Sequence, residues 1–286
     1  MKKNILVTGA LILAAVIFVT SGICVFAAEK NSFPPAGVYF ARHENYTAWT
    51  DSAYNPYFTL QVYEVKGGER FLEYEDILLR DENGKDYSLK DASIQVIFSD
   101  VYFTSYRLVC VLDRNNLPKD ETVFTYAVMR GTEKNNIFPI GRVTVSIGDC
   151  NSALTFAGAT ASAEELQSYN VKVTNAGDGS VTVTGLDFSL EGIRAEFGYY
   201  DNENRYFQIG DGVRLAKGDS VILHCTFEGN DAFRSIPFSE FKPLVVFRTG
   251  REEMRVSVNN KATYFAALGR AEIKNYLRGL SSGTTV

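Results

Sequence analysis

The chain has 286 residues, of which 45% are hydrophobic and 13% aromatic, so it carries enough apolar material for a core and global disorder is excluded. Its formal net charge is −5 and it has no basic runs, which argues against partners such as nucleic acid or an anionic membrane surface. This length is comfortable for two domains.

Residues 1–28 are predicted to direct export. Lys2 and Lys3 precede a long uncharged run, and residues 25–27 offer small side chains for cleavage, as in a secretory signal peptide. The same run is long enough to span a bilayer as an uncleaved anchor, although the polar residues at 20–22 favour cleavage. Either way the lysines stay inside, so the chain is expected to be extracytoplasmic, secreted or anchored to the membrane.

Beyond the export segment, alternation of apolar and polar residues predicts strands with one face on a core and the other in water. The segments with this pattern are 58–62, 94–98, 143–147, 171–173, 181–183 and 256–258. Asn83-Gly84 lies between two apolar runs and predicts a hairpin with a type I′ turn. The predicted fold class is therefore all-β.

The order of strands and loops recurs at an offset of about 115 residues, the length of one sandwich domain. This recurrence predicts two tandem β-sandwich domains, at 33–149 and 150–262. Residues 263–286 are predicted to form a C-terminal helix and tail. An amphipathic helix is expected over Tyr264–Arg278, with Gly279 placed to end it.

The segments 169–175, 181–188 and 215–223 resemble strands and turns of the immunoglobulin-like sandwich domains of exported bacterial proteins. The resemblance covers residues 153–260. It implies two tandem immunoglobulin-like sandwiches and a role in adhesion, spacing or ligand binding, without choosing among these. The Cys-Trp-Cys core of antibody domains is missing, because the single tryptophan, Trp49, lies elsewhere.

The common catalytic motifs are absent from the sequence: there is no Gly-x-Ser-x-Gly elbow, phosphate-binding glycine loop or His-Glu-x-x-His. With only His43 and His224, a histidine-rich metal site cannot form, and no metal or other cofactor is predicted. His224 and Cys225 are strand neighbours and face opposite sides, so they make a poor catalytic pair. Cys110 and Cys225 are interpreted as strand-interior residues, and a disulfide from Cys150 to either is left open.

The candidate ligand-binding residues are Tyr46, Trp49, Tyr54 and Tyr57, which lie in an aromatic stretch interleaved with Thr, Asp, Ser and Asn side chains. Aromatic faces beside hydrogen-bonding groups suit sugar rings and peptides. The alternative is that these rings plug one end of the first sandwich.

The leading hypothesis is a non-enzymatic extracytoplasmic protein that binds a cell-surface protein or polysaccharide through this aromatic stretch. The first alternative is a structural subunit or spacer, which docks on another chain through edge strands or the 264–280 helix. The second is a hydrolase, because 34 acidic residues could supply a pair of catalytic carboxylates.

Overall fold

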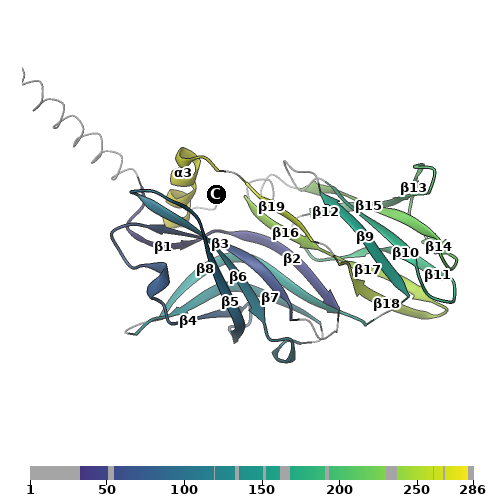
Figure 1. Ribbon diagram of the computed structural model, residues 1–286, viewed down its shortest axis with the longest axis horizontal. Coiled ribbons are helices and arrows are strands. Elements are labelled where there is room, and N and C mark those ends of the chain that lie inside the picture. The colour runs from purple at the N-terminus through teal and green to yellow at the C-terminus, as the bar shows by residue number, and fades with distance from the viewer. Residues whose placement is uncertain are drawn as a thin grey trace, which may run out of the picture.

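The computed structural model describes residues 33–50, 55–118, 120–132, 135–150, 153–161, 168–190, 193–229, 237–259, 261–266 and 268–282. The predicted all-β class with a short C-terminal helix is confirmed, since strands dominate these residues and two sandwiches lie end to end (Figure 1). Within the described part, no helix is long and apolar enough to span a membrane. The predicted export segment lies outside the described residues.

The first sandwich is built on a sheet of ten strands that folds over on itself. In spatial order these are β1 (Gly37–Phe40), β3 (Tyr57–Val65), β6 (Phe103–Leu112), β5 (Asp86–Ser99), β4 (Asp76–Asp81), β7 (Glu121–Arg130), β8 (Asn135–Gly148), β2 (His43–Thr50), β16 (Phe238–Lys242) and β19 (Ala262–Phe265). Neighbours pair antiparallel, except that β2 runs parallel to both β8 and β16.

β5 carries the sheet from one layer of the first sandwich to the other. Its residues 86–88 pair with β4, whereas residues 89–99 pair with β6. The two layers therefore face each other around a core that includes Phe58, Leu108 and Phe124, all fully buried. Two short 3-10 helices, η1 (Phe71–Glu73) and η2 (Arg114–Asn116), lie in its connections.

The hairpin predicted around Asn83-Gly84 is confirmed, because β4 and β5 pair on either side of it. The type I′ turn is wrong. Gly84 has a φ of 85°, but Asn83 is not in the left-handed region, because its N–H is held by the Asp81 carboxylate at 3.0 Å. The loop is thus a three-residue turn with glycine alone in the left-handed position.

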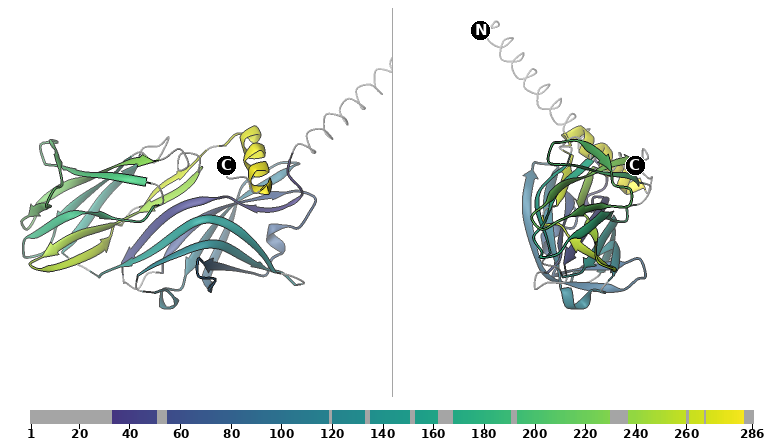
Figure 2. Two further views of the ribbon diagram at one scale, coloured as in Figure 1. Left: turned by 180° about the vertical axis from the view of Figure 1, so that it is seen from behind. Right: turned by 90° about the vertical axis from the view of Figure 1, so that its right-hand side faces the viewer.

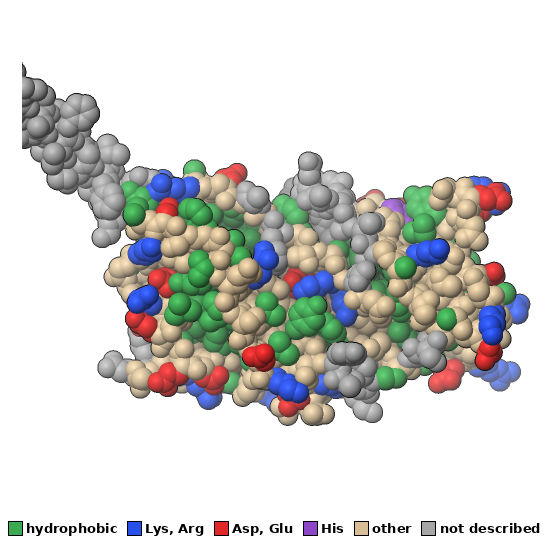
Figure 3. Space-filling view, in the orientation of Figure 1, with side chains coloured by type: hydrophobic (Ala, Val, Ile, Leu, Met, Phe, Trp, Pro, Cys, Tyr) green, Lys and Arg blue, Asp and Glu red, His purple; other side chains and the backbone are tan. Residues whose placement is uncertain are grey.

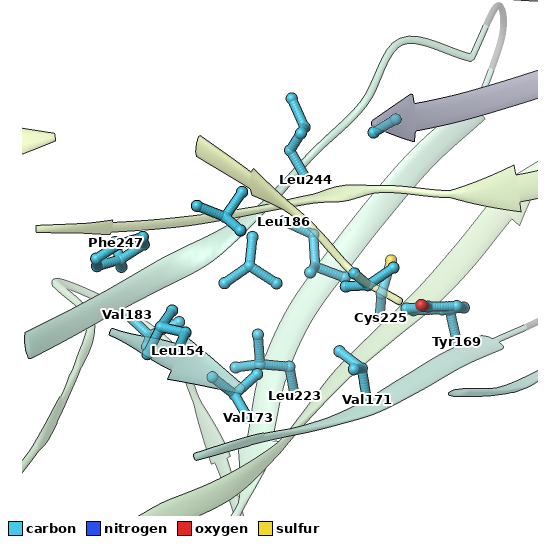
Figure 4. Close-up of a cluster of buried hydrophobic side chains, with 14 of the residues drawn as sticks. Leu154, Tyr169, Val171, Val173, Val183, Leu186, Leu223, Cys225, Leu244 and Phe247 are labelled. Atoms are coloured by element: carbon cyan, nitrogen blue, oxygen red, sulfur yellow. The ribbon is translucent and has the colours of Figure 1, made fainter. Parts of the chain in front are cut away.

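The second sandwich packs a five-stranded sheet on a four-stranded sheet. The first holds β13 (Tyr206–Gln208), β12 (Ile193–Tyr200), β15 (Ser220–Gly229), β10 (Ser168–Asn175) and β9 (Leu154–Ala161), and the second holds β14 (Val213–Leu215), β11 (Val181–Asp187), β17 (Leu244–Thr249) and β18 (Glu252–Ser257). Alternate residues of both sheets, such as Val171, Leu223 and Phe247, point into the core between them (Figure 4).

Strand β2 contributes to both sandwiches. Its Tyr46 and Ala48 belong to the core of the second sandwich, while Trp49, on the opposite face of the strand, packs against the core of the first. The two sandwiches are therefore joined by packed side chains at this strand. The predicted domain ranges, 33–149 and 150–262, stay a prediction.

Two buried side chains satisfy the backbone of β3 where no strand lies beside it. The Thr59 N–H donates to Glu240 Oε2 at 3.2 Å, and the Gln61 N–H donates to His43 Nε2 at 3.0 Å. Because an unsatisfied buried N–H is costly, these contacts hold the two layers of the first sandwich together. Burial lowers the pKa of His43 to about 3, so its ring is neutral and can accept.

The C-terminal helix is α3 (Arg270–Ser282), shorter and later than the predicted Tyr264–Arg278. Tyr264 lies in β19 instead, because residues 262–265 find a ladder partner in β16. Glu272 accepts the Gly269 N–H at 2.6 Å, which caps the start of the helix, and the helix continues past Gly279. The end-on and rear views place α3 beside the first sandwich (Figure 2).

Cys110 and Cys225 lie in separate cores, so the structure does not join them, and burial raises the pKa of both thiols. Cys150 is exposed. The interpretation of Cys110 and Cys225 as small strand-interior residues is confirmed by their complete burial. Their protonated thiols are poor nucleophiles.

Candidate ligand-binding hollow on the second sandwich

Tyr46, predicted as a ligand contact, is buried in the core of the second sandwich. Only 1% of its surface is exposed, and its ring meets Phe188 edge-on at 6.3 Å in the second core. Burial also raises the pKa of its hydroxyl. Since residues along a strand alternate between faces, Tyr46 points into the second sandwich while Trp49 points the other way.

Trp49 and Tyr57 do come together, with ring centroids 4.7 Å apart. Lys242 Nζ lies 3.4 Å from the Trp49 ring centroid, and Lys261 Nζ lies 4.7 Å from that of Tyr57. The chain's own lysines therefore cover these aromatic faces. Tyr57 is 40% exposed, and Tyr54 lies outside the described residues.

The charged groups beside these rings help to connect the two sheet layers of the first sandwich. Lys261 Nζ pairs with Glu240 Oε1 at 2.7 Å, the carboxylate that also accepts from β3. Burial, reinforced by the charge of Lys261, lowers the pKa of Lys242 to about 7. This arrangement agrees with the alternative that the aromatic rings pack within the fold. Ligand binding at Trp49 and Tyr57 stays a prediction.

An open hollow of about 620 Å³ lies on the outer face of the five-stranded sheet. Register places Tyr200 (β12), Ile222 (β15) and Lys172 (β10) side by side in one row across this face. The hollow is lined by Ala157, Gly158, Asn170, Lys172, Tyr200, Asn204 and Ile222. Its volume falls in the range of small-molecule sites.

A β-bulge shapes one side of this hollow. Val171 pairs with Ala159 but Lys172 pairs with Ala157, so Gly158 is the extra residue on β9. Its φ of 59° is left-handed, and no atom lies within 4 Å of where a Cβ would stand. The bulge needs glycine for its backbone conformation and bends the strand at the hollow.

Three rings cluster at one side of the hollow, and one of them, Tyr200, belongs to its lining. Tyr200 and Tyr206 have centroids 5.4 Å apart, and the His224 ring meets them edge-on at 5.4 and 6.0 Å. Tyr206 lies over Gly198, where an added Cβ would stand 2.4 Å from its ring. The missing side chain at Gly198 thus lets Tyr206 lie flat against the sheet, with 45% of its surface exposed.

The turn before Tyr206 is internally braced. The Asp201 carboxylate accepts the N–H groups of Glu203 at 2.9 Å and Arg205 at 3.0 Å, and also bonds the Arg205 side chain. These hydrogen bonds lower the pKa of Asp201. Asn204, which lines the hollow, is held at a φ of 58° by this turn.

The polar groups of the hollow are positioned by hydrogen bonds. His224 Nδ1 lies 2.6 Å from Asn170 Oδ1, and its Nε2 lies 3.0 Å from Thr226 Oγ1. Burial lowers the pKa of His224, so at neutral pH Nδ1 donates to the amide oxygen and Nε2 accepts. The His224 ring thereby orients the Asn170 amide and packs against both tyrosine rings, and Lys172 adds one cationic donor to the hollow.

This arrangement can bind a ring-shaped polar molecule: exposed tyrosine faces offer stacking, and asparagine and lysine offer hydrogen bonds. Among the described residues, no group of three histidine, cysteine or acidic side chains is placed to hold a metal ion. The hollow's lining contains no carboxylate.

Sequence reasoning missed this site, although a signal was present. Tyr199-Tyr200 and Tyr206-Phe207 flank the polar turn at 201–205, which predicts an aromatic hairpin. What the sequence did not show is the pairing that brings His224 and Asn170 beside that hairpin, since those contacts join residues far apart in the chain.

No family model and no curated protein matches this chain. Among solved structures, the chain is similar to the crystal structure of a chicken TCR, with 10% sequence identity and a TM-score of 0.23. The match covers 78% of this chain and 99% of that one. A likeness at this TM-score carries no argument about function.

Proposed function

We propose that this protein is a non-enzymatic, extracytoplasmic binding protein of the cell surface, and that it holds a glycan in the hollow on its second sandwich. In this proposal residues 1–28 deliver the chain across the membrane as a cleaved signal or retain it as an anchor. The two sandwiches are of the immunoglobulin-like kind found in exported bacterial proteins and present the hollow away from the membrane.

One observation carries the proposal: the Tyr206 ring is 45% exposed, yet it is fixed over Gly198 and beside His224. An aromatic face held in place but left uncovered costs little entropy when a ligand stacks on it. The rings at Tyr46 and Trp49 lack this combination, because the protein's own side chains already cover them.

The chemistry around Tyr206 favours a sugar over a purely apolar ligand. Asn170 and Asn204 supply amide groups, and Lys172 supplies an ammonium group, at the edges of the hollow. Hydroxyl groups of a sugar can pair with these, and a sugar carboxylate would also gain from the lysine. An extended peptide from a cell-surface protein is the alternative ligand.

Titration calorimetry against a panel of neutral and acidic cell-wall oligosaccharides tests the proposal. Tyr206→Ala is expected to weaken binding roughly tenfold, because stacking on one aromatic ring contributes on the order of 1 kcal/mol. The matched control is Tyr126→Ala, which removes a tyrosine that is 41% exposed on the first sandwich.

Equal affinity in wild type and Tyr206→Ala would remove the hollow as the site. Binding of no oligosaccharide in the panel would leave the peptide alternative, which the same variants test against cell-surface protein fragments. Release of reducing sugar from any oligosaccharide during long incubation would contradict the non-enzymatic part of the proposal.

A further inference from the structure

One long edge of β5 lacks a partner strand in the described part of the structure. Residues 89–99 pair with β6 on one side only, since β4 reaches no further than residue 88. The edge therefore presents a row of backbone donors and acceptors that another strand could pair with. Two bulges, at Lys90 and Ile97, bound a regular segment between them.

This edge is also unusually apolar for an exposed strand. Ile94 is 41% exposed and Val96 is 55% exposed, although they face the same side as the fully buried Leu108 on β6. β5 thus overhangs the core of the first sandwich. Hydrophobic side chains gather on the surface where β4, β5 and β6 are labelled (Figures 1 and 3). An exposed apolar patch of this kind commonly marks a surface that contacts another molecule.

We propose that the free edge of β5 pairs antiparallel with the same edge of a second copy of this chain, about a two-fold axis at Ile94. The pairing would continue the sheet from one copy into the other. It is independent of the glycan-binding hollow, which lies on the second sandwich.

The sequence of the regular segment is complementary to itself in this register. Opposite residues share a face in an antiparallel pair, so Ile94 meets Ile94 and Ala92 meets Val96 on the core side. On the outer side Ser93 meets Gln95. Apolar groups thus face apolar groups and polar groups face polar groups, which a shift by one residue would destroy.

Opposite charges also lie near the two ends of the edge. Lys90 precedes the segment, and Asp100 follows it. In this register Lys90 of one copy lies opposite Phe98 of the other, and Asp100 is its diagonal neighbour two residues further on, within reach of a long side chain. The Asp100 carboxylate also accepts the Tyr102 and Phe103 N–H groups and pairs with Arg270 at 3.5 Å. Because the two-fold contact uses the edge of both copies, assembly stops at a dimer.

Disulfide trapping tests the register directly. The full chain, purified in mild detergent, carries Cys24→Ser and Cys150→Ser, so that the native thiols left are those of the buried Cys110 and Cys225. In this background Ile94→Cys is expected to form a covalent dimer on mild oxidation, because directly opposed residues have the Cα spacing of a disulfide. The matched control is Ile137→Cys, which replaces an isoleucine 50% exposed on β8.

Pairing raises the local thiol concentration, so Ile94→Cys should cross-link about tenfold faster than Ile137→Cys or more. Equal rates for the two variants would overturn the proposal. Sedimentation velocity provides the second measurement: wild type should show a concentration-dependent dimer that Val96→Lys abolishes and Ile137→Lys leaves intact. A wild-type monomer at every concentration, or a dimer indifferent to Val96→Lys, would equally overturn it.

Discussion

Two segments of this chain, 46–57 and 199–207, are similarly rich in aromatic residues, but the rings of the first are covered and a ring of the second is exposed. In the first, Tyr46 is buried in the second core and Trp49 is covered by Lys242. In the second, Tyr206 stays exposed while Gly198 and His224 fix its position. The described residues of the first segment lie where the two sandwiches meet, and the second segment lies on an outer sheet face.

This difference shows that aromatic density alone does not indicate a binding surface. A ring on a strand that is shared by two cores is used for packing whichever way it points, as Tyr46 and Trp49 illustrate. A ring can meet a ligand when one face of its strand is exposed to water. A neighbouring glycine, which has no side chain, then leaves space for the ring to lie against the sheet. Four changes, three substitutions and one change of pH, separate these roles.

Tyr46→Ala should cost about 3–5 kcal/mol of unfolding free energy, the range for removing a buried aromatic ring from a core. Chemical denaturation of wild type and variant measures this loss. The folded fraction should still bind the glycan with unchanged affinity. A variant as stable as wild type but defective in binding would show that Tyr46 contacts ligand after all.

Acid should destabilise the protein through His43. Its pKa is about 3 in the folded chain and near 6.5 when unfolded, so the unfolded state binds more protons below pH 6.5. Stability from this group is complete above pH 6.5 and falls by roughly 1.4 kcal/mol per unit as pH drops toward 3. The pKa of His224 is also lowered, so this residue likewise makes the protein less stable as the pH falls.

Denaturation at pH 7 and pH 5 checks this slope, with His43→Gln as the comparison, because an amide keeps an acceptor for the Gln61 N–H but does not titrate there. The variant should lose less stability than wild type between the two pH values. An identical loss in both would mean that His43 does not couple folding to pH.

Gly198→Ala should weaken glycan binding roughly tenfold by displacing Tyr206, while the residues that line the hollow itself are unchanged. The new Cβ would stand 2.4 Å from the Tyr206 ring and must push it away, at small cost because the ring is at the surface. Calorimetry of binding and of unfolding gives both effects. Full affinity in this variant would show that the position of Tyr206 is irrelevant.

Lys242→Met should change stability by less than about 1 kcal/mol, since the lost contact with the Trp49 ring is offset by relief from burying an ammonium group. Emission of Trp49, the only tryptophan, should lose its pH dependence near 7, where Lys242 titrates. Glycan affinity should not change. A large loss of affinity would return the aromatic stretch to the list of binding surfaces.

Much of the fold could be predicted from local patterns, because strand alternation and the Asn83-Gly84 hairpin depend on residues that are neighbours in the sequence. The start of α3 could not be predicted in this way. Residues 262–265 are compatible with a helix or a strand, and they form a strand because they pair with β16. Long-range pairing likewise decided the site. Nothing near Tyr206 in the sequence reveals that His224 contacts its ring, or that Asn170 is bonded to His224.

The most direct test of the account uses the scarcity of two residue types: the chain has two histidines and one tryptophan. Protein labelled on histidine and tryptophan rings gives three resolved NMR signals that can be followed during titration with the oligosaccharide that binds in calorimetry. We expect the His224 signal to shift in a saturable way while those of His43 and Trp49 stay fixed. A shift of Trp49 with His224 unmoved would contradict the account and place the ligand at the aromatic stretch instead.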